Sequence, residues 1–459
     1  MAKPQTTIDR WLAREVPAAS LAVFRVLFGL LLCGSTIRFV ANGWVEKFFV
    51  ERTFFFDFWI APGVRPLEPA GMYTLVLCVA LGSLGIALGL FYRVSAAVVF
   101  FGFTYVELID VTNYLNHYYL GSLVCGLLML LPLHRVWSLD AWRKPELSRE
   151  TLPALYLWVL RFQFSVVYVY AGLAKLGSDW LIDAQPLTIW LRARQDTFLI
   201  GPLLEYSWVP YAFSWGGFVF DLTIVAWLRW SKTRVYAYAL VVVFHCTTGA
   251  LFNIGIFPLM MMVGATLFLS PAWPSTVLPQ KLRAWLSRSR STATSMPKMW
   301  GKRLGLWAVP LGLYCCVQLV LPLRHWWYPG NVLWTEEGMR FSWRVMVRAK
   351  KGSVQYRVTL PTEQRSFWVE PRRYLSAYQT EEMSGQPDLI LQLAHHIGNE
   401  YRQRGHEDVE VRVRSRVSLN GRPPAALIDP GRNLLLETDG LLAADWVSPL
   451  QTTADYKSR

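Results

Sequence analysis

The amino-acid sequence predicts a polytopic α-helical membrane domain of about nine spans over residues 1–323, followed by a β-rich α+β extracytoplasmic domain over residues 324–459. The 459 residues are 53% hydrophobic and only 17% charged, against about 25% charged in a typical soluble domain. Of the 78 charged residues, 35 lie after residue 323. Apolar runs of about 20 residues recur before that point, and such a run is long enough for a helix to cross a bilayer.

Nine apolar segments are long enough, some of them barely, to cross a hydrocarbon core of about 30 Å. We expect spans at residues 18–41, 72–92, 95–112, 117–134, 154–176, 211–229, 235–250, 254–270 and 304–322. The seventh and eighth could instead form one interrupted segment, because Asn253 and Gly255 separate them. The first residues carry no short apolar core with a small-residue cleavage site, so we expect no cleaved signal peptide.

Basic residues predict the orientation of these spans. Lys and Arg concentrate in alternate loops, and the loop at 271–303 holds seven basic residues and no acidic one. Basic loops favour the cytoplasmic side of a membrane. Nine spans then place the N-terminus in the cytoplasm and the hydrophilic domain outside it, whereas eight spans would place that domain inside. Most of the net charge of +14 lies in these loops, which favours a lipid bilayer over nucleic acid as partner.

The hydrophilic domain carries strand patterns and one helix pattern. Apolar residues alternate with polar ones over residues 409–417 and again over residues 354–358, as expected for strands with one buried face. Within residues 377–403 we expect one helix, which begins near Asp388. Residues 287–298 form a Ser- and Arg-rich stretch, interpreted as a flexible basic loop at the membrane surface.

The cysteines predict neither a metal site nor a disulfide framework. All six lie in apolar segments and none in the hydrophilic domain: Cys33, Cys78, Cys125, Cys246, Cys315 and Cys316. Their spacing matches no metal-binding motif, and we interpret them as small packing residues. Nucleotide-binding glycine motifs are also missing from the sequence. Because the cysteine spacing matches no metal-binding motif, we predict no metal site.

Lys175 is the most informative polar residue within a predicted span. It lies near the outer end of the fifth span, where a lysine can extend its amine to the interface without any further role. Alternatively, Tyr168, Tyr170 and Leu176 partly dehydrate it. Desolvation disfavours the charged form, and a neutral amine can act as a base.

Two histidines occur at a similar predicted depth. His117 follows Asn116 at the junction of the third and fourth spans, and His245 lies in the outer half of the seventh. Taken singly, each is more typical of a hydrogen-bonded packing residue than of a catalytic one. Together with Lys175 they all fall near the extracytoplasmic side, which predicts one site at that membrane boundary.

Three carboxylates lie within predicted spans, where an uncompensated charge is costly. They are Glu107, Asp110 and Asp221. The simplest interpretation pairs them with Arg25 or Arg161, the cations of the first and fifth spans, and we favour it for Glu107 and Asp221. Asp110 lies close to the Asn-His segment, and we expect it to orient that histidine.

At these segments the sequence resembles the vitamin K-dependent gamma-glutamyl carboxylase family. The resemblance runs in order through TYVELIDVTNYLNHYYL, VYVYAGLAKLGSDW, FHCTTGALFNIGIFP, FSWRVMV and the IDP of residues 428–430. The segments with the lysine and the Asn-His pair are the specific ones.

The resemblance implies an integral membrane enzyme that couples oxygenation of reduced vitamin K to its epoxide with carboxylation of peptide glutamate. It implies that Lys175 deprotonates the hydroquinone and that His117, beside Asn116, serves the glutamate half-reaction. It places His245 near the quinone, and Asp110 joins Asn116 and His245 among the expected binding residues. Dioxygen and carbon dioxide are the implied co-substrates. A lipid-soluble quinone and a glutamate-containing peptide are the implied partners.

Two departures from the vertebrate members indicate a prokaryotic relative in a cell membrane. Ala174 stands where they have a second lysine, and the hydrophilic domain has no cysteine for their disulfide. Two alternatives stay open. The first is a quinone epoxidase that carboxylates no glutamate, and the second is a non-enzymatic membrane scaffold or transporter. A transporter would be expected to show internal repeats, and the sequence has none.

Overall fold

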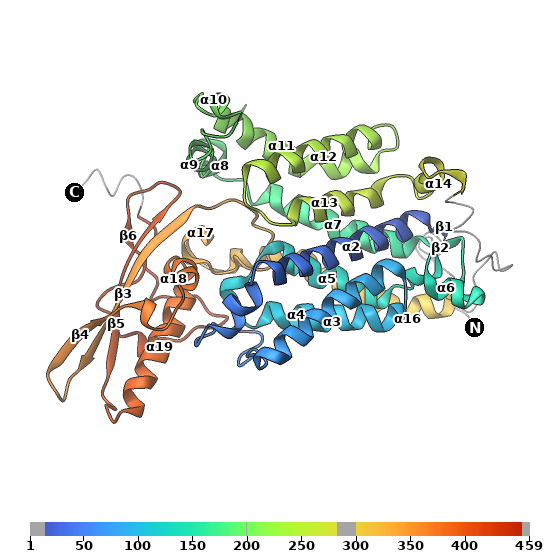
Figure 1. Ribbon diagram of the computed structural model, residues 1–459. Helices are drawn as coiled ribbons and strands as arrows, with labels where there is room; N and C mark the ends of the chain where they lie inside the picture. The colour runs from blue at the N-terminus through green and yellow to red at the C-terminus, as the bar shows by residue number, and fades with distance from the viewer. Residues whose placement is uncertain (1–13, 199, 282–299, 452–459) are drawn as a thin grey trace, which may run out of the picture.

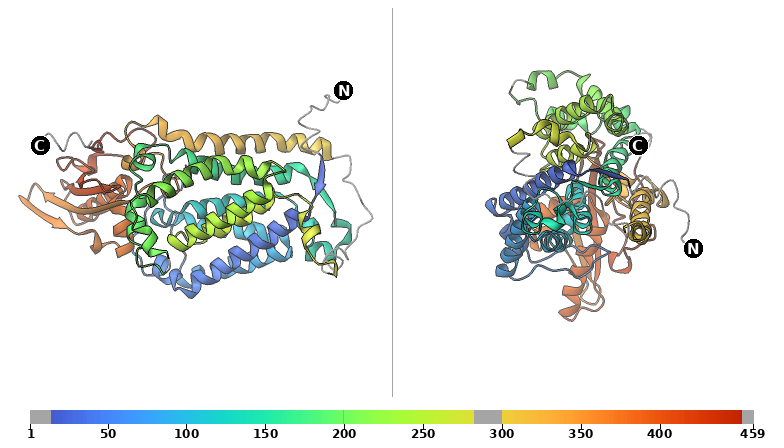
Figure 2. Two further views of the ribbon diagram at one scale, coloured as in Figure 1. Left: turned by 90° about the horizontal axis from the view of Figure 1, so that it is seen from above. Right: turned by 90° about the vertical axis from the view of Figure 1, so that its right-hand side faces the viewer.

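A computed structural model describes residues 14–198, 200–281 and 300–451. Long helices lie roughly parallel to one another and form an elongated bundle, and a small sheet with its own helices lies at one end (Figure 1). Seen from above, the sheet again extends beyond the helix ends (Figure 2). The expected basic loop at 287–298 lies outside the described residues.

Each predicted span overlaps a helix. These helices are α2 (Ala19–Ala41), α3 (Pro69–Leu88), α4 (Tyr92–Leu108), α5 (Asn116–Leu130), α7 (Ala154–Leu173), α11 (Val209–Arg229), α12 (Arg234–Leu251), α13 (Phe257–Ala265) and α16 (Trp300–Val320). Within the described ranges, five are long and apolar enough to cross a membrane, namely α2, α3, α7, α11 and α12. The chain is thus an integral membrane protein, and the count of nine spans stays a prediction.

The helices pack as two groups that meet along α13. In the first group α2 packs on α3, α3 on α4 and α4 on α5. In the second, α7 packs on α11, α11 on α12 and α12 on α13. Helix α13 also contacts α2 and α7. Helix α13 continues as a 3-10 turn over Thr266–Phe268. The seventh and eighth predicted spans correspond to α12 and α13, two helices separated by a bend at residues 252–256.

Arg25 and Arg161 bind main-chain carbonyls rather than carboxylates. Arg25 donates to the carbonyls of Ile86 and Ala87 at 2.7 Å each. Arg161 donates to the carbonyl of Leu267 at 2.8 Å. These carbonyls lie at the end of α3 and in the 3-10 turn that follows α13. Helix ends leave carbonyls without partners inside the helix. The predicted pairing of the intramembrane carboxylates with Arg25 or Arg161 is therefore wrong.

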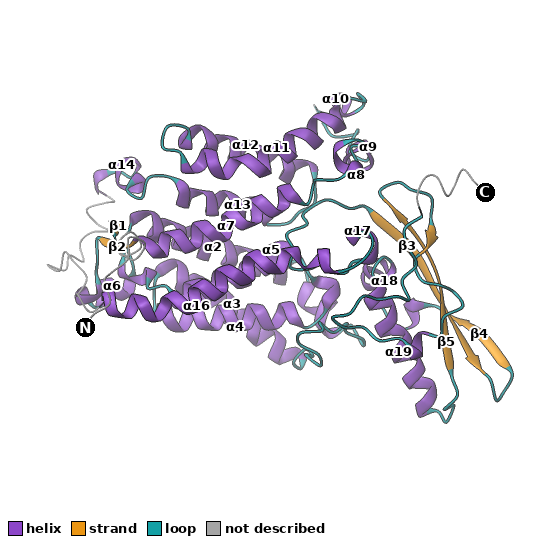
Figure 3. Cartoon of the chain, turned by 180° about the vertical axis from the view of Figure 1, so that it is seen from behind, coloured by secondary structure: helices purple, strands orange, loops and turns teal. Residues whose placement is uncertain are grey.

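The two ends of the bundle differ. A short ribbon of β1 (Glu15–Pro17) and β2 (Thr151–Pro153) lies at the end far from the large sheet, with α6 (Leu139–Arg143) and α14 (Trp273–Val277) (Figure 1). The short helices α8 (Ser178–Leu181), α9 (Leu187–Arg192) and α10 (Gly201–Leu204) lie at the sheet end (Figure 3). The first described strand and the large sheet thus occupy opposite ends.

The C-terminal domain is built on a four-stranded antiparallel sheet of order β4-β3-β5-β6. Its strands are β3 (Lys350–Leu360), β4 (Arg365–Val369), β5 (Glu410–Leu419) and β6 (Ala425–Ala426). Both strand patterns expected from the sequence are confirmed. The register sets Tyr356 opposite Val413, and both side chains are buried.

Helices cover one face of this sheet. They are α18 (Ala377–Ser384), which contacts β3, and α19 (Pro387–Gln403), which contacts β5, and α17 (Val332–Thr335) precedes them. The helix expected near Asp388 is confirmed as α19, but the segment 377–403 holds two helices, not one. A capping box between Ser376 and Gln379 begins α18, and that signal was missed.

Loops at the sheet end of the bundle complete the core of the C-terminal domain. Phe56, Phe58 and Val111 pack into the same buried cluster as the sheet residues. Asp179 of α8 accepts from Arg422 at 2.5 and 2.7 Å and from Asn420 at 2.8 Å. These contacts attach the sheet to the helix ends where the polar residues of interest lie.

The packing role predicted for the cysteines holds in part. Cys125 is fully buried, whereas Cys78, Cys246 and Cys316 are exposed on helix surfaces. All six cysteines are free thiols.

Candidate active site at the sheet end of the bundle

Lys175 lies in a mostly apolar cavity at the sheet end of the second helix group. Helices α7, α8, α11, α12 and α13 supply its walls, and Val345 and Met346 of the C-terminal domain contribute to them. Lys175 is 6% exposed, and its amine lies 5.1 Å from the centre of the Trp180 ring. The amine is therefore enclosed and does not extend to the interface.

The Lys175 amine is paired with Asp221 of α11. Nζ donates to Oδ2 of Asp221 at 2.8 Å and to the carbonyl of Ala171 at 3.0 Å. Both side chains are more than nine-tenths buried. Removal of one partner from such a pair leaves an uncompensated buried charge, which costs about 3–5 kcal/mol.

Tyr168 and His245 face the same cavity. The Tyr168 hydroxyl and Nε2 of His245 are 3.0 Å apart, and both residues line the cavity with Lys175 and Asp221. Nδ1 of His245 is buried and has no hydrogen-bond partner among the described residues. This ring nitrogen is free to bond a ligand.

Helix periodicity explains how the sequence brings these groups together. Tyr168, Ala171 and Lys175 are spaced by three and four residues, so they lie on one face of α7 and of the turn that follows it. Gly217 and Asp221 are likewise one turn apart on α11, and both line the cavity. A Cβ at residue 217 would lie in ordinary van der Waals contact with the Trp180 ring, at 3.8 Å.

His117 lies nearby but does not line this cavity. Its ring centre is 6.2 Å from that of Phe257, and the ring centre of His245 is 6.3 Å from the same phenylalanine. His117 also packs on Gly255, whose φ is +59° and whose missing Cβ would lie 3.2 Å from Nε2. Phe257 thus contacts both histidines, and Lys175 meets only His245 within one cavity.

A second, polar cavity of about 600 Å³ adjoins the first. Phe252, Ile254 and Met346 line both cavities. Asn116, beside His117, lines the polar cavity between the helix ends and the C-terminal domain. Asn116 and Lys175 therefore lie in adjoining chambers.

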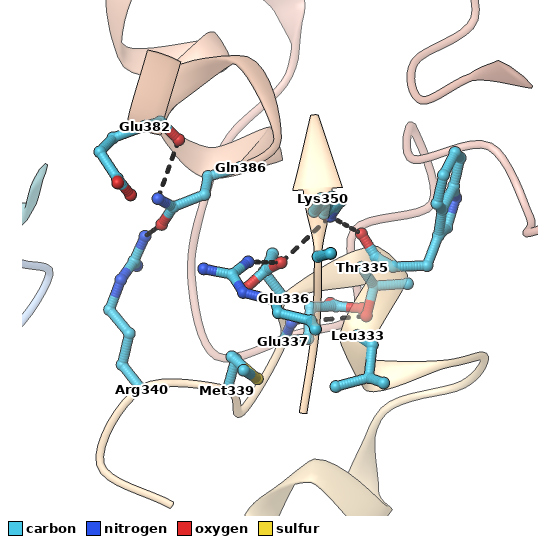
Figure 4. Close-up of polar contacts among 12 residues, drawn as sticks. Leu333, Thr335, Glu336, Glu337, Met339, Arg340, Lys350, Glu382 and Gln386 are labelled. Carbon is cyan, nitrogen blue, oxygen red and sulfur yellow. Dashed lines mark hydrogen bonds and ion pairs between the residues drawn. The ribbon is translucent and has the colours of Figure 1, made fainter. Parts of the chain in front are cut away.

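Four arginines and two glutamates line the polar cavity: Arg194, Arg340, Arg344, Arg348, Glu336 and Glu382. Lys350 donates to Glu336 at 3.1 Å, and Gln386 bridges Arg340 and the main chain of Glu382 (Figure 4). Arg348 also pairs with Glu336. The cavity is thus positively charged overall.

Arg344 is the arginine that most resembles a free anion-binding group. Its Nε is buried without a hydrogen-bond partner among the described residues. Burial lowers the pKa of Arg344 to about 10, although Glu336 opposes the shift, so the guanidinium stays charged at neutral pH. Burial also raises the pKa of Glu382, which reduces the negative charge in the cavity as the pH falls.

Asp110 is not where it was expected. Its carboxylate accepts from Arg52 at 2.8 Å and from Gln379 of α18 at 2.8 Å, and Asp110 is fully buried. The expectation that it orients His117 is therefore wrong, because the short turn that follows α4 directs the carboxylate toward the C-terminal domain. Glu107 accepts from Ser122 at 2.5 Å and pairs with no arginine among the described residues.

Sequence reasoning missed the partner of the lysine and the arginine-lined cavity. Asp221 was recognised as an unusual intramembrane carboxylate, but Lys175 was not weighed as its partner. Arg340, Arg344 and Arg348 fall within nine residues, but Arg194 lies about 150 positions before them, and local sequence does not show that they share a cavity. The described residues bring no three His, Cys, Asp or Glu side chains together that could hold a metal ion.

Two family models match this chain. A family model described as the HTTM domain matches residues 13–273. A second, described as "Vitamin K-dependent gamma-carboxylase, lumenal domain", matches residues 304–453. No solved structure matches the chain. The first match spans the helices that hold Lys175 and His245, the second spans the domain that covers them, and the chain belongs to the vitamin K-dependent gamma-carboxylase family.

Proposed function

We propose that this membrane protein couples oxidation of reduced vitamin K to its epoxide with carboxylation of peptide glutamate. The observation that carries the proposal is the buried Lys175–Asp221 pair in an apolar cavity next to an arginine-lined one. The first cavity suits an apolar ring with hydroxyl groups, and the second suits an acidic peptide.

The Lys175 cavity fits reduced vitamin K chemically. Its walls are mostly apolar, and the Lys175–Asp221 pair and Nδ1 of His245 offer hydrogen bonds to hydroxyl groups. When bound, reduced vitamin K supplies the electrons for reaction with dioxygen and the basicity needed to remove a γ-proton from glutamate. Residues 167–175, 213–221 and 244–261 would hold it.

Lys175 moves the proton. In the resting ion pair the Lys175 ammonium passes a proton to Asp221, at 2.8 Å, and the free amine then takes a proton from a hydroxyl group. The carboxylate thereby restores the free base that a permanently charged lysine could not provide. Trp180 and the apolar walls exclude water, which strengthens these interactions. Tyr168 holds Nε2 of His245, so the ring keeps one orientation and Nδ1 stays available for a hydrogen bond.

The arginine-lined cavity binds the acidic acceptor. Arg344 and Arg194 attract carboxylates, and Asn116 lies at the same wall. His117 and His245 both contact Phe257. Phe252 and Ile254 line both cavities, so the glutamate γ-carbon would reach the Lys175 cavity past these two residues. Carbon dioxide is the electrophile that the resulting carbanion attacks.

We place residues 1–323 in the membrane, with the N-terminus cytoplasmic, and residues 324–459 outside the cytosol. Two findings support this topology. Strand β1 and the large sheet lie at opposite ends of the bundle (Figure 1), and the second matching family model is described as a lumenal domain. The site then faces the extracytoplasmic side.

The test is product formation by purified protein in detergent, supplied with reduced vitamin K, a glutamate peptide and labelled bicarbonate. We expect epoxide and labelled peptide, with both lost in Lys175→Ala and both kept in Lys351→Ala, whose lysine is exposed on β3. Epoxide without label would refute the carboxylation half and establish a quinone epoxidase. Neither product from folded protein would refute the enzyme and favour a scaffold or transporter.

A further inference from the structure

A second apolar cavity lies in the first helix group, apart from the Lys175 cavity. It encloses about 190 Å³ between α2, α3, α4 and the turn after α4. The two cavities have no lining residue in common. Tyr378 of α18 lines it from the C-terminal domain, so the cavity lies at the same end of the bundle as the proposed active site.

Two buried polar atoms in its wall have no partner. Glu107 is 7% exposed; Ser122 donates to its Oε2 at 2.5 Å, but Oε1 has no hydrogen-bond partner among the described residues. Nδ2 of Asn113 is also buried and unpartnered, while its Oδ1 accepts from Arg52 at 3.3 Å. A buried polar atom without a hydrogen-bond partner is costly and therefore favours a ligand that supplies one. The wall therefore offers one acceptor and one donor to a ligand.

We infer that this cavity binds a lipid-soluble molecule that carries a hydroxyl group on an apolar body. A hydroxyl is both donor and acceptor, so it can donate to Glu107 or accept from Asn113. Most of the remaining wall is aliphatic or aromatic. One water needs a cavity of only about 10–15 Å³ by this measure, far less than the volume here, and apolar cavities of about 150 Å³ stay dry and take apolar ligands.

The position of the cavity gives such a ligand access from the bilayer. Large apolar side chains are exposed on the outer faces of α2, α3 and α4, including Ile37 at 59%, Leu77 at 58% and Phe101 at 64%. An apolar molecule dissolved in lipid meets these faces directly. It would enter between the helices without crossing water.

The cavity also adjoins the segment that carries Asn116 and His117. Leu115 lines both this cavity and the arginine-lined cavity, so a ligand here contacts the residue that precedes the Asn-His pair. This inference rests on the proposed function for its relevance. Reduced vitamin K and an isoprenoid alcohol share the required chemistry. Through Leu115, binding of either one in this cavity would affect the arginine-lined cavity proposed to bind the glutamate peptide.

Photoaffinity labelling without dioxygen tests the inference in the full-length protein. The probe is a naphthol that carries a diazirine, and labelled peptides are mapped after digestion. We expect label on peptides that contain Phe103, Tyr118 or Tyr378, which line this cavity. Unlabelled naphthol should compete about ten-fold better than naphthalene, because one hydrogen bond to a buried group is worth about one factor of ten.

Variants separate this cavity from the Lys175 cavity, whose own labelling reports that the protein is folded. Glu107→Leu removes the acceptor and should weaken labelling here about ten-fold. Ser122→Ala, which leaves Oε1 in place, should retain it. Val106→Trp fills the cavity and keeps Glu107, so it should abolish the label here even if the leucine variant fails to fold.

Equal competition by naphthalene, or unchanged labelling in Glu107→Leu and Val106→Trp, would overturn the inference. Competition by reduced vitamin K or by geranylgeraniol supports it and identifies the source of the hydroxyl. Epoxide formation by the wild type, measured separately, keeps the two proposals distinct. Epoxide without label in this cavity refutes only the second site, and label without epoxide refutes only the proposed function.

Discussion

The Lys175–Asp221 pair allows the chemical role of the lysine to be separated from its structural role. At 2.8 Å, an effective dielectric constant of about 20 gives an attraction of about 6 kcal/mol. Burial of each ion costs several kcal/mol, so the pair as a whole is nearly neutral for stability. Loss of one partner leaves the other charge buried without compensation.

We therefore expect Lys175→Met and Asp221→Leu each to destabilise the protein by about 3–5 kcal/mol, and the double variant to lie within about 1–2 kcal/mol of the wild type. The assay is equilibrium denaturant unfolding in detergent, followed by the fluorescence of the 22 tryptophans. Epoxide formation from reduced vitamin K is measured on the same samples. The double variant should be stable and inactive.

Two results would refute this reasoning. If the double variant loses as much stability as both single variants together, the charges do not compensate each other and the pair is not formed. If the stable double variant still forms epoxide, Lys175 is not the base. Tyr170→Phe serves as control, because its hydroxyl donates to the carbonyl of Leu319 outside the cavity.

Three further predictions concern the surroundings of the site. Tyr168→Phe leaves Nε2 of His245 unpaired and should raise the KM for reduced vitamin K several-fold with a smaller change in kcat, as steady-state kinetics would show; an unchanged KM contradicts the role of His245. Because burial raises the pKa of Glu382, its protonation removes negative charge as the pH falls. The KM for an acidic peptide should then fall as the pH is lowered, starting above the ordinary titration range of a glutamate, and Glu382→Gln should have a low KM with no such dependence. Asp179→Asn removes the ion pair with Arg422 and should destabilise docking of the C-terminal domain by about 1–3 kcal/mol, seen as faster proteolysis there; an unchanged cleavage rate would show that the pair does not hold the domain.

Local sequence predicted where each helix that overlaps an expected span would lie. Runs such as residues 19–41 and 154–173 are apolar along their length, and lipid forces such a run to satisfy its own backbone hydrogen bonds as a helix. Strands β3 and β5 were predicted from the alternation of apolar and polar residues, which is also a property of contiguous sequence. Helix α18 was missed, because its eight residues are too few to show a clear period, although its capping box is a readable signal.

The candidate site was predictable as residues but not as contacts. Lys175 and His245 stood out because polar groups are costly within apolar spans, and that cost needs no knowledge of neighbours. Their partners depend on which helix faces meet. Asp221 could face Arg161 or Lys175 on sequence grounds, and the packing of α11 on α7 selects the lysine.

The sequence by itself determined the class of this protein: an integral membrane bundle followed by a strand-containing hydrophilic domain. Composition and period are properties of contiguous residues, so they can be read along the chain. Only the tertiary structure decided that Asp110 binds Arg52, that Lys175 meets Asp221, and that Arg194 lines one cavity with Arg340, Arg344 and Arg348. The two ion pairs join residues 58 and 46 positions apart, and burial, rather than spacing, determines which charges must pair.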